Sequence, residues 1–515
     1  MWKSFFLWIV CLLSASVASD ARMAIAEHPS AGAEKPAELK AGFAERDITP
    51  EIGMETPGGY GKTYCRVIHD PCKVRAAVLD DGKTRVALVS VDGCVIFRHV
   101  VQDAREAIQR QCGIPQHAVL IGATHSHSSG PLGDVQPGQY DHASPLVKRL
   151  AYERSACADP RYLKRVHQQI VDAVCEADKL RTPSQAGVGK GLARGLAFSR
   201  RMRMKNGQVW THPGQGNPDI LDYAGPGDPE VAVLGAWDAS GKLRGCVVNF
   251  ACHATTCPPG ISANYIYYLE KVIRGYYGPD VIVLFFPGDA GDMTQVDNLS
   301  PYANPDGDRW AQIVGGSLGA EALKALLNMP TGPLVPLDAR NEVLSINRRV
   351  PSSQRVQRAY EIVQQDPKQV NPTELTFATQ IVLLDALLQK GVATEVEVQA
   401  IQVGPAVFLA SPGELFCQYQ LDQKARSPFP VTFCVSVANG FNGYVPTDES
   451  FGPHGGGYET RLMSNSNLEV GAGGRIVETA LKLAGQMQPG PMPERPKAPP
   501  FHASWPYGNV PPEVQ

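Results

Sequence analysis

Two histidines separated by one residue follow a short apolar segment of the sequence. Residues 118–124 are mostly apolar, and His125 and His127 come directly after Thr124. Side chains alternate between the two faces of an extended strand, so this spacing places both imidazoles on one face. One imidazole could then bind a metal ion while the other transfers protons.

Three further apolar segments end in residue types that bind metal ions. They are residues 245–251, which precede His253; residues 406–410, which precede Glu414; and residues 431–438, which precede Tyr444. Ligands of α/β sheets bind outside the carboxyl ends of strands, so residues distant in sequence can converge there. Two imidazoles and a carboxylate suit a zinc ion that lowers the pKa of a bound water to about 7. A phenol is a less usual ligand.

Each of these residues also has a structural explanation. A single histidine at a strand end is more often a hydrogen-bonded structural residue, and Glu414 could complement the dipole of a following helix. The loop from Gly288 to Asp292 could be an ordinary turn, and Tyr444 could be a packed aromatic ring. Only their joint placement at strand ends favours a functional site.

Alternating apolar and helical segments predict an α/β fold with a mixed β-sheet core flanked by helices. Strands are predicted at residues 85–91, 118–124, 245–251, 281–286 and 406–410, and helices at 100–111, 161–177, 267–276 and 310–327. Residues 352–390 are predicted to form two consecutive helices inserted into this layout, with a capping signal at Asn371 for the second. The site is expected at the strand ends.

Composition limits the class of protein and its partners. The chain has 515 residues, of which 43% are hydrophobic and 19% charged, so it can bury a large globular core. Lys plus Arg number 48 against 51 Asp plus Glu, a net charge of −3 without a basic block, so no nucleic-acid partner is expected. Cys65 and Cys72 are the most plausible local disulfide pair.

Both ends of the sequence differ from its middle. Residues 1–18 have one positive charge before a short apolar segment and small residues after it, which predicts a signal peptide. We therefore expect a secreted or periplasmic protein without an integral membrane segment once the signal is removed. A catalytic domain is predicted over residues 40–487, followed by a proline-rich tail over residues 488–515.

The motifs together resemble the catalytic domain of the neutral (alkaline, non-lysosomal) ceramidase family. The matching pieces are Gly42-Phe-Ala-Glu-Arg-Asp-Ile-Thr-Pro, Gly122-Ala-Thr-His-Ser-His-Ser-Ser-Gly-Pro, Asn249-Phe-Ala-Cys-His253, Gly288-Asp-Ala-Gly-Asp292, Pro412-Gly-Glu414 and Asn442-Gly-Tyr444-Val-Pro-Thr. They occur in the family's order. The resemblance implies an α/β catalytic domain with a zinc ion at the base of a pocket.

The resemblance also implies roles for individual residues. The implied zinc ligands are His125, His253, Glu414 and Tyr444. His127 resembles the family's general acid and base, and Tyr458 resembles a tyrosine that stabilises the oxyanion. An arginine that contacts substrate corresponds to Arg200 or Arg201, between which the sequence does not decide. Asp292 and Thr294 are expected to bind substrate, although the family's loop reads Gly-Asp-x-Ser-Pro-Asn and this chain has threonine in place of the serine.

The implied function is zinc-dependent hydrolysis of an N-acyl amide bond, as in the cleavage of ceramide to a sphingoid base and a fatty acid. A zinc hydrolase of another amide or ester, and a binding protein that keeps the fold without turnover, are the alternatives. Ceramide needs a deep apolar channel, whereas a shallower pocket would suit smaller amides or esters. No C-terminal immunoglobulin-like domain is expected, because the proline-rich tail follows the catalytic segment.

Overall fold

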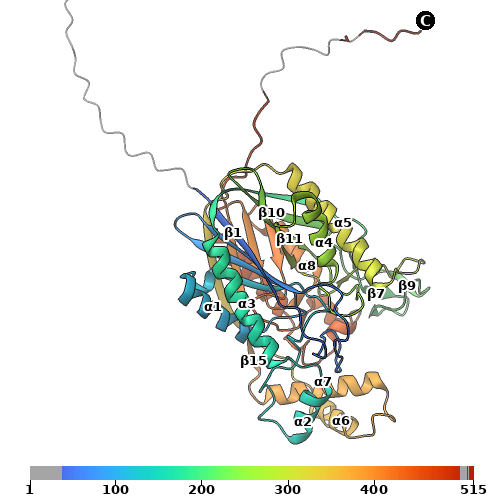
Figure 1. Ribbon diagram of the computed structural model, residues 1–515. Coiled ribbons are helices and arrows are strands. Elements are labelled where there is room, and N and C mark those ends of the chain that lie inside the picture. The colour runs from blue at the N-terminus through green and yellow to red at the C-terminus, as the bar shows by residue number, and fades with distance from the viewer. Residues whose placement is uncertain (1–37, 499–506, 509) are drawn as a thin grey trace, which may run out of the picture. The chain divides into compact units, whose positions relative to one another are not determined.

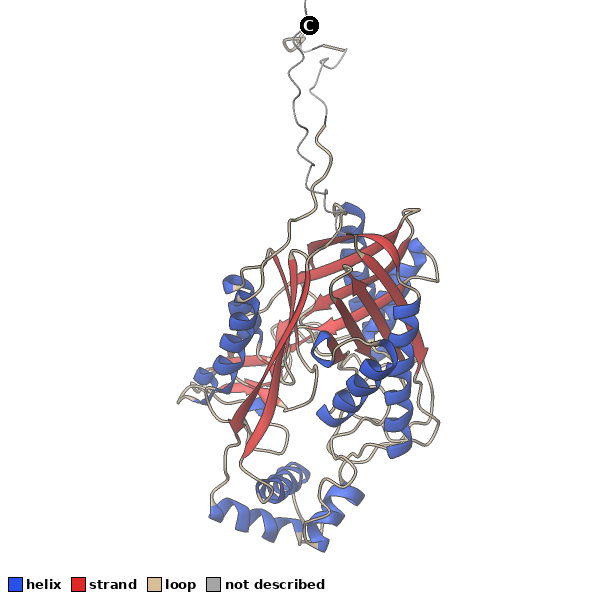
Figure 2. Ribbon diagram, turned by 90° about the vertical axis from the view of Figure 1, so that its left-hand side faces the viewer, coloured by secondary structure: helices blue, strands red, loops and turns tan. Residues whose placement is uncertain are grey.

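The computed structural model describes residues 38–498, 507–508 and 510–515, so the predicted signal peptide lies outside the described residues. The predicted α/β fold is confirmed by two mixed sheets with helices against their outer faces (Figures 1 and 2). The larger sheet has the strand order β12-β11-β10-β5-β1-β2-β3-β4. Its strands are β1 (Lys40–Asp47), β2 (Lys73–Asp80), β3 (Arg85–Val91), β4 (Val119–Ala123), β5 (Thr182–Leu192), β10 (Glu230–Asp238), β11 (Leu243–Phe250) and β12 (Ile282–Pro287).

The second sheet has four strands in the order β14-β15-β16-β18. They are β14 (Leu337–Asn347), β15 (Ala393–Val403), β16 (Ala406–Ala410) and β18 (Val431–Val435). Shorter strands form three small sheets: β7 (Arg201–Met204) between β8 (Val209–Thr211) and β9 (Ile220–Tyr223), β6 (Phe198–Ser199) with β13 (Met293–Thr294), and β17 (Glu414–Leu415) with β19 (Tyr444–Val445).

Helices cover the outer faces of both sheets. They are α1 (Arg98–Cys112), α3 (Pro160–Lys179), α4 (Tyr265–Tyr277), α5 (Gly307–Asn328), α8 (Cys417–Arg426) and α9 (Ala472–Gly485). α3 packs on β1 and β2, α4 and α5 pack on the half of the large sheet that contains β10, and α9 packs on β14 to β16. The strands and helices predicted from the sequence therefore all form, with ends that shift by up to a few residues.

Three parallel strand pairs lead into the predicted site. β3 pairs with β4, β11 with β12 and β16 with β18 in parallel, and each pair is joined by one helix: α1, α4 and α8 respectively. A parallel pair needs such a crossover, and its carboxyl ends lie at one edge. The three βαβ units therefore carry His125, His253 and Glu414 at their strand ends.

Buried hydrogen bonds connect strands that are far apart in the order of the large sheet, and they also connect the large sheet to the second sheet. Ser90 Oγ in β3 donates to the carbonyl of Phe285 in β12 (2.7 Å). Asn249 Nδ2 in β11 donates to the carbonyls of Phe286 (2.9 Å) and Cys434 in β18 (2.8 Å). An unpaired amide buried here would cost about 1–3 kcal/mol, so these contacts fix how the sheets approach each other.

Four helical segments form a separate small module that we call the helical cap. It consists of α2 (Pro145–Arg149), the adjoining π-helical turn Leu150–Arg154, α6 (Ser353–Val363) and α7 (Pro372–Leu388), which share their own hydrophobic cluster and lie together in Figure 1. α6 and α7 interrupt the connection between β14 and β15, which confirms the predicted helical insertion. The side chain of Asn371 caps α7 by accepting from the N–H of Thr373 (2.9 Å).

The predicted pairing of Cys65 with Cys72 is wrong. Both thiols are free, and the disulfide of the described residues joins Cys112 to Cys175, whose Cα atoms are 5.9 Å apart. This pair forms because α1 and α3 pack side by side, a contact that cysteine spacing does not report. Within the described residues no helix is both long and apolar enough to cross a bilayer.

A buried ion pair network supports the strand ends near the site. Arg75 in β2 is 1% exposed and bonds Asp92, directly after β3, at 2.9 Å and Glu270 in α4 at 2.6 Å. We expect Arg75→Met to lower the free energy of unfolding by about 3–5 kcal/mol, because the buried Asp92 loses its counter-ion, whereas Glu270 keeps Lys73 and Arg274. Urea denaturation measures the change. Arg203→Met is the matched control, since it breaks the exposed pair with Asp222 and should cost at most about 1 kcal/mol.

Candidate metal centre and active site

Three predicted ligands converge although they come from three different βαβ units. Oε2 of Glu414 lies 3.3 Å from Nε2 of His125 and 3.1 Å from Nε2 of His253. All three side chains are buried, with exposures of 3%, 1% and 5% for His125, His253 and Glu414. Their ligand atoms lie within 4.8 Å of one another, a spacing that could hold a metal ion.

The hydrogen bonds behind the imidazoles determine which nitrogens face the centre. Nδ1 of His125 lies 2.7 Å from the carbonyl oxygen of Cys94, and Nδ1 of His253 lies 2.7 Å from that of Ala290. A carbonyl only accepts, so each Nδ1 carries a proton and each Nε2 is the nitrogen that faces Glu414. Although burial opposes it, Glu414 raises the pKa of His125 well above its usual range. The carboxylate and the two Nε2 atoms therefore attract a positive charge between them, which a metal ion would supply.

The donor set fits zinc, which takes histidine nitrogen and carboxylate oxygen and commonly keeps a position open in hydrolases. Burial opposes ionisation of Glu414, yet the imidazoles of His125 and His253 hold its pKa well below the usual range. Burial, with Arg200 beside the ring, lowers the pKa of His253 to about 4, so this imidazole is neutral. A second group, Cys94 with His125 and His127, also has metal-binding spacing, but its His127 is only half-buried.

Backbone contacts between the strand ends explain the convergence. The N–H of Val437, after β18, donates to the carbonyl of Gly413 (3.2 Å), and the carbonyl of Val437 accepts from Ala123 at the end of β4 (3.1 Å). Val437 and His125 have φ values of 52° and 62°, a region that residues other than glycine seldom adopt. Such strain gathers at functional sites, where surrounding structure holds it.

Tyr444 is brought beside Glu414 by strand pairing. The two residues are register partners in the parallel pair of β17 and β19, and Tyr444 lines the same cavity as His125 and Glu414. The guanidinium carbon of Arg200 lies 5.4 Å from the centre of its ring. The structure thus brings Tyr444 beside Glu414, while its role as a fourth ligand stays a prediction. At Gly291, a Cβ atom would collide with the carbonyl of Glu414, so this glycine permits the close approach of the Gly-Asp-Ala-Gly-Asp loop.

His127 stands next to the three ligands but outside their set. Its Nε2 lies 3.4 Å from Nε2 of His125, and its half-buried ring lines a cavity of about 60 Å³ at the centre, which we call the metal cavity. Burial and the imidazoles of His125 and His253 lower the pKa of His127 well below its usual range. The ring is therefore neutral and lines the metal cavity.

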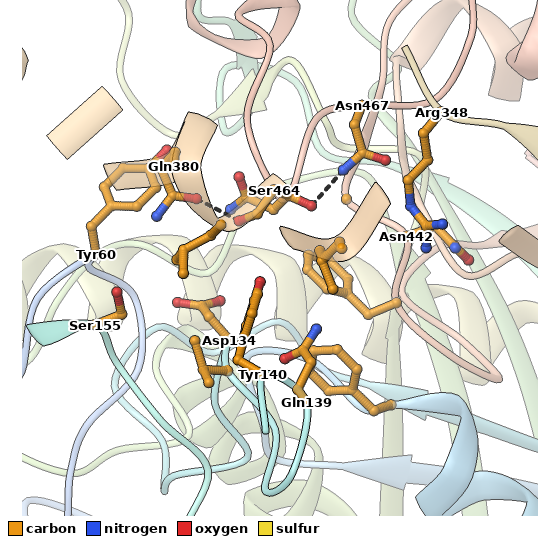
Figure 3. Close-up of a pocket in the computed structure, with 17 residues that line it drawn as sticks. Tyr60, Asp134, Gln139, Tyr140, Ser155, Arg348, Gln380, Asn442, Ser464 and Asn467 are labelled. Carbon is orange, nitrogen blue, oxygen red and sulfur yellow. Dashed lines mark hydrogen bonds between the residues drawn. The ribbon is translucent and has the colours of Figure 1, made fainter. Parts of the chain in front are cut away.

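Tyr458 also lines the metal cavity, and its hydroxyl forms a short hydrogen bond with that of Tyr60. Burial raises the pKa of Tyr458 to about 12, so the hydroxyl keeps its proton near neutral pH. Tyr60 and Asp134, which line the metal cavity and the space beside it (Figure 3), were not predicted from the sequence. The available signals were a tyrosine flanked by glycines at 58–61 and an aspartate after Gly133.

The structure separates the two candidate arginines. Nη1 of Arg200 lies 3.4 Å from Nε2 of His253, and its Nε donates to Oε1 of the fully buried Glu459 (2.7 Å). Arg201 points elsewhere: it donates to the carbonyl of Gly456 (2.8 Å) and lies over the ring of Phe416. Arg200 is therefore the arginine that reaches the centre.

Asp292 and Thr294 are buried close to the centre but are not among the residues that line the metal cavity. Oδ1 of Asp292 accepts from the N–H of Cys417 (2.8 Å) at the start of α8, and Oγ1 of Thr294 accepts from Val296 (3.3 Å). Asp292 thereby braces the segment that carries Glu414. A substrate-binding role for these two residues stays a prediction.

Comparison with known proteins shows similarity to a curated relative and to solved structures. A neutral ceramidase of Pseudomonas aeruginosa is 25% identical over 280 residues, which cover 51% of this chain and 38% of that protein. The crystal structure of the P. aeruginosa neutral ceramidase superposes with a TM-score of 0.63 at 18% identity, over 90% of this chain and 77% of that one. A ceramidase complexed with C2 gives the same values. No family model matches the chain.

We expect zinc to stabilise the metal-free protein, because binding only the folded state adds about 2.7 kcal/mol at a zinc concentration of 100 times Kd. A thermal melt with and without zinc measures the shift. His253→Ala should abolish it by removing a ligand, while His454→Ala, at an exposed histidine, should keep it. An equal shift in all three proteins would contradict the assigned ligand set.

Proposed function

We propose that this chain is a zinc-dependent hydrolase of an N-acyl amide bond. The proposal builds on its resemblance to the neutral ceramidase family, which is confirmed in sequence and in fold. The observation that carries the proposal is the convergence of His125, His253 and Glu414, with His127 3.4 Å from one of them. Metal-assisted hydrolysis needs side chains that hold the metal ion and a separate group that transfers protons. Two imidazoles and a carboxylate can hold the ion here, and a third imidazole beside them can transfer protons.

The protein's own groups divide the work of amide cleavage. His125, His253, Glu414 and Tyr444 would hold the zinc ion, which when bound supplies a Lewis acid and an acidified water. Nε2 of His127 would accept the proton of the attacking water and deliver it to the departing amine nitrogen. General acid and base catalysis of this kind contributes about 10²–10⁴-fold.

Two further groups face the charge that develops on the carbonyl oxygen. The hydroxyl of Tyr458 keeps its proton and would donate to that oxygen. Arg200 brings a positive charge to the same side, and Glu459 keeps its guanidinium in place. Since Glu459 also accepts from Thr211 Oγ1 (2.7 Å), the arginine is held by a fixed network rather than by a mobile side chain.

The alternatives are a zinc hydrolase of another amide or ester, and a binding protein without turnover. A non-catalytic homologue would not need the proton-carrying His127 beside the ligands, so the geometry favours turnover. The curated relative and the solved structures support ceramidase-like chemistry, and the matched segment spans 38% of the curated relative's length. We further propose that the protein is exported, on the basis of residues 1–18.

Hydrolysis of a short N-acyl amide by zinc-loaded protein tests the proposal. We expect His127→Ala to lower kcat by about 10²–10⁴-fold while bound zinc is retained, because this residue moves protons without ligating the metal. His125→Ala should lose both zinc and activity. Metal analysis and amine release are measured on the same samples. Full activity in His127→Ala would refute the assigned role.

The tyrosine near the carbonyl oxygen has its own test. We expect Tyr458→Phe to lower kcat by about 10²–10³-fold, as for removal of one oxyanion donor, with little change in zinc content. Steady-state kinetics on the same amide measures the loss. Tyr276→Phe, at an exposed tyrosine of α4, is the matched control and should behave as the unmodified protein.

A further inference from the structure

Three adjoining cavities connect the metal centre with the helical cap. The metal cavity of about 60 Å³ shares Tyr60, Asp134, Phe441 and Asn465 with a middle cavity of about 100 Å³. The middle cavity (Figure 3) shares Tyr60, Ser155 and Gln380 with an outer cavity of about 310 Å³ between α2, the adjoining π-helical turn, α6 and α7. Tyr60 lines all three, so a molecule bound along this path would pass it before reaching His127.

The middle cavity is small, and its lining is about half polar and half apolar. Side chains that offer hydrogen bonds there are Gln139, Gln380, Asn442, Ser464, Asn465 and Asn467. Apolar side chains such as Leu383, Leu387 and Phe441 also line it. Pockets for drug-sized ligands measure roughly 300–1,000 Å³, so about 100 Å³ is poor space for a long alkyl chain. It suits a short group that makes hydrogen bonds.

Three arginines along this path form no salt bridge with any described residue. Arg348 lines the middle cavity half-buried and donates to the carbonyls of Ala393 (3.2 Å) and Gly391 (3.5 Å). Arg149 and Arg154 are exposed and line the outer cavity. The fully buried Arg75, by contrast, pairs with Asp92 and Glu270. Arg349, half-buried and outside this path, also has no salt bridge with a described residue and donates to the carbonyls of Leu468 and Thr460.

No carboxylate among the residues that line the middle and outer cavities neutralises the charge of these arginines. No aspartate or glutamate is among the residues that line the outer cavity. Asp134 is the acid of the middle cavity, and it belongs to the wall shared with the metal cavity; Figure 3 shows it on a different side from Arg348. A half-buried guanidinium without a carboxylate is a costly arrangement that an anionic ligand would relieve.

We propose that the substrate of this site is a short N-acyl amide whose polar part carries an anionic group, either a carboxylate or a phosphate. Arg348 binds that group in the middle cavity while the amide bond reaches His127, and Arg149 and Arg154 attract it through the outer cavity. This inference rests on the proposed function and specifies its substrate class. It differs from ceramide, which is neutral and carries two long apolar chains.

The test compares amides that share one acyl group. N-butanoylglycine carries a carboxylate, N-butanoylethanolamine is neutral, and the phosphate ester of the latter carries a phosphate; a short-chain ceramide is the reference. We expect kcat/KM for at least one charged amide to exceed that of the neutral amide by about tenfold or more, as one charge-assisted contact provides. The advantage should shrink as ionic strength rises.

Arginine variants locate the recognition. Arg348→Gln should reduce the preference for the charged amide by about tenfold, and Arg348→Lys should restore part of it, because charge remains. Arg149→Gln with Arg154→Gln should weaken the salt dependence. Arg194→Gln, at an exposed arginine that lines none of the three cavities, is the matched control. Equal rates for all amides, equal losses for charged and neutral amides in Arg348→Gln, or a preference for the ceramide would overturn the inference.

A binding measurement separates this inference from the proposed function. Calorimetry on zinc-loaded His127→Ala protein reports recognition without turnover. If no amide is cleaved by the unmodified enzyme, the proposed function fails; the anion site nevertheless stands if N-butanoylglycine binds and Arg348→Gln abolishes binding. If neutral amides are cleaved and the charged amide binds no better than they do, the proposed function stands and the inference fails.

Discussion

The centre of this protein depends on two imidazole nitrogens and a carboxylate oxygen that are buried face to face. Backbone carbonyls hold a proton on Nδ1 of His125 and of His253, so both Nε2 atoms are turned toward Oε2 of Glu414. A buried carboxylate needs a positive charge beside it, and Glu414 accordingly raises the pKa of His125 well above its usual range. The rest of the fold supplies the rigidity that keeps these groups together: parallel strand pairs, buried Asn249 between two sheets, and strained backbone at Val437.

Chemistry and recognition are built by different parts of the chain. The metal centre lies at the ends of three βαβ units, where short parallel strands fix side chains closely. The path that leads to it is lined by the helical cap and by loops, and Tyr60 joins the two parts because its hydroxyl meets Tyr458 and its side chain lines each cavity. A change in the cap could therefore alter which amide is bound and leave the ligands of the metal in place. This separation is common where a rigid sheet carries catalysis and loops carry specificity.

Local patterns in the sequence account for much of the fold. Strands such as residues 85–91 and helices such as α3 were predictable because their periodicity is an intrinsic property of the segment. His125, His253 and Glu414 were predictable because each follows a buried strand. The pairing of Cys112 with Cys175 was not, since it depends on how α1 packs against α3. Arg348 and Asp134 were missed for a similar reason: each lies in a loop without periodic signal, and only its neighbours reveal its environment.

The sequence by itself determined the element types, the residues at the strand ends and the resemblance to the neutral ceramidases, because each of these is written in segments of a few residues. Tertiary structure decided which nitrogen of each imidazole faces the centre, that Arg200 rather than Arg201 reaches it, and which arginines lack a carboxylate. Those properties arise from contacts between residues that are 31 to 259 positions apart, and the free energy of such contacts depends on distance and burial, which no local pattern encodes.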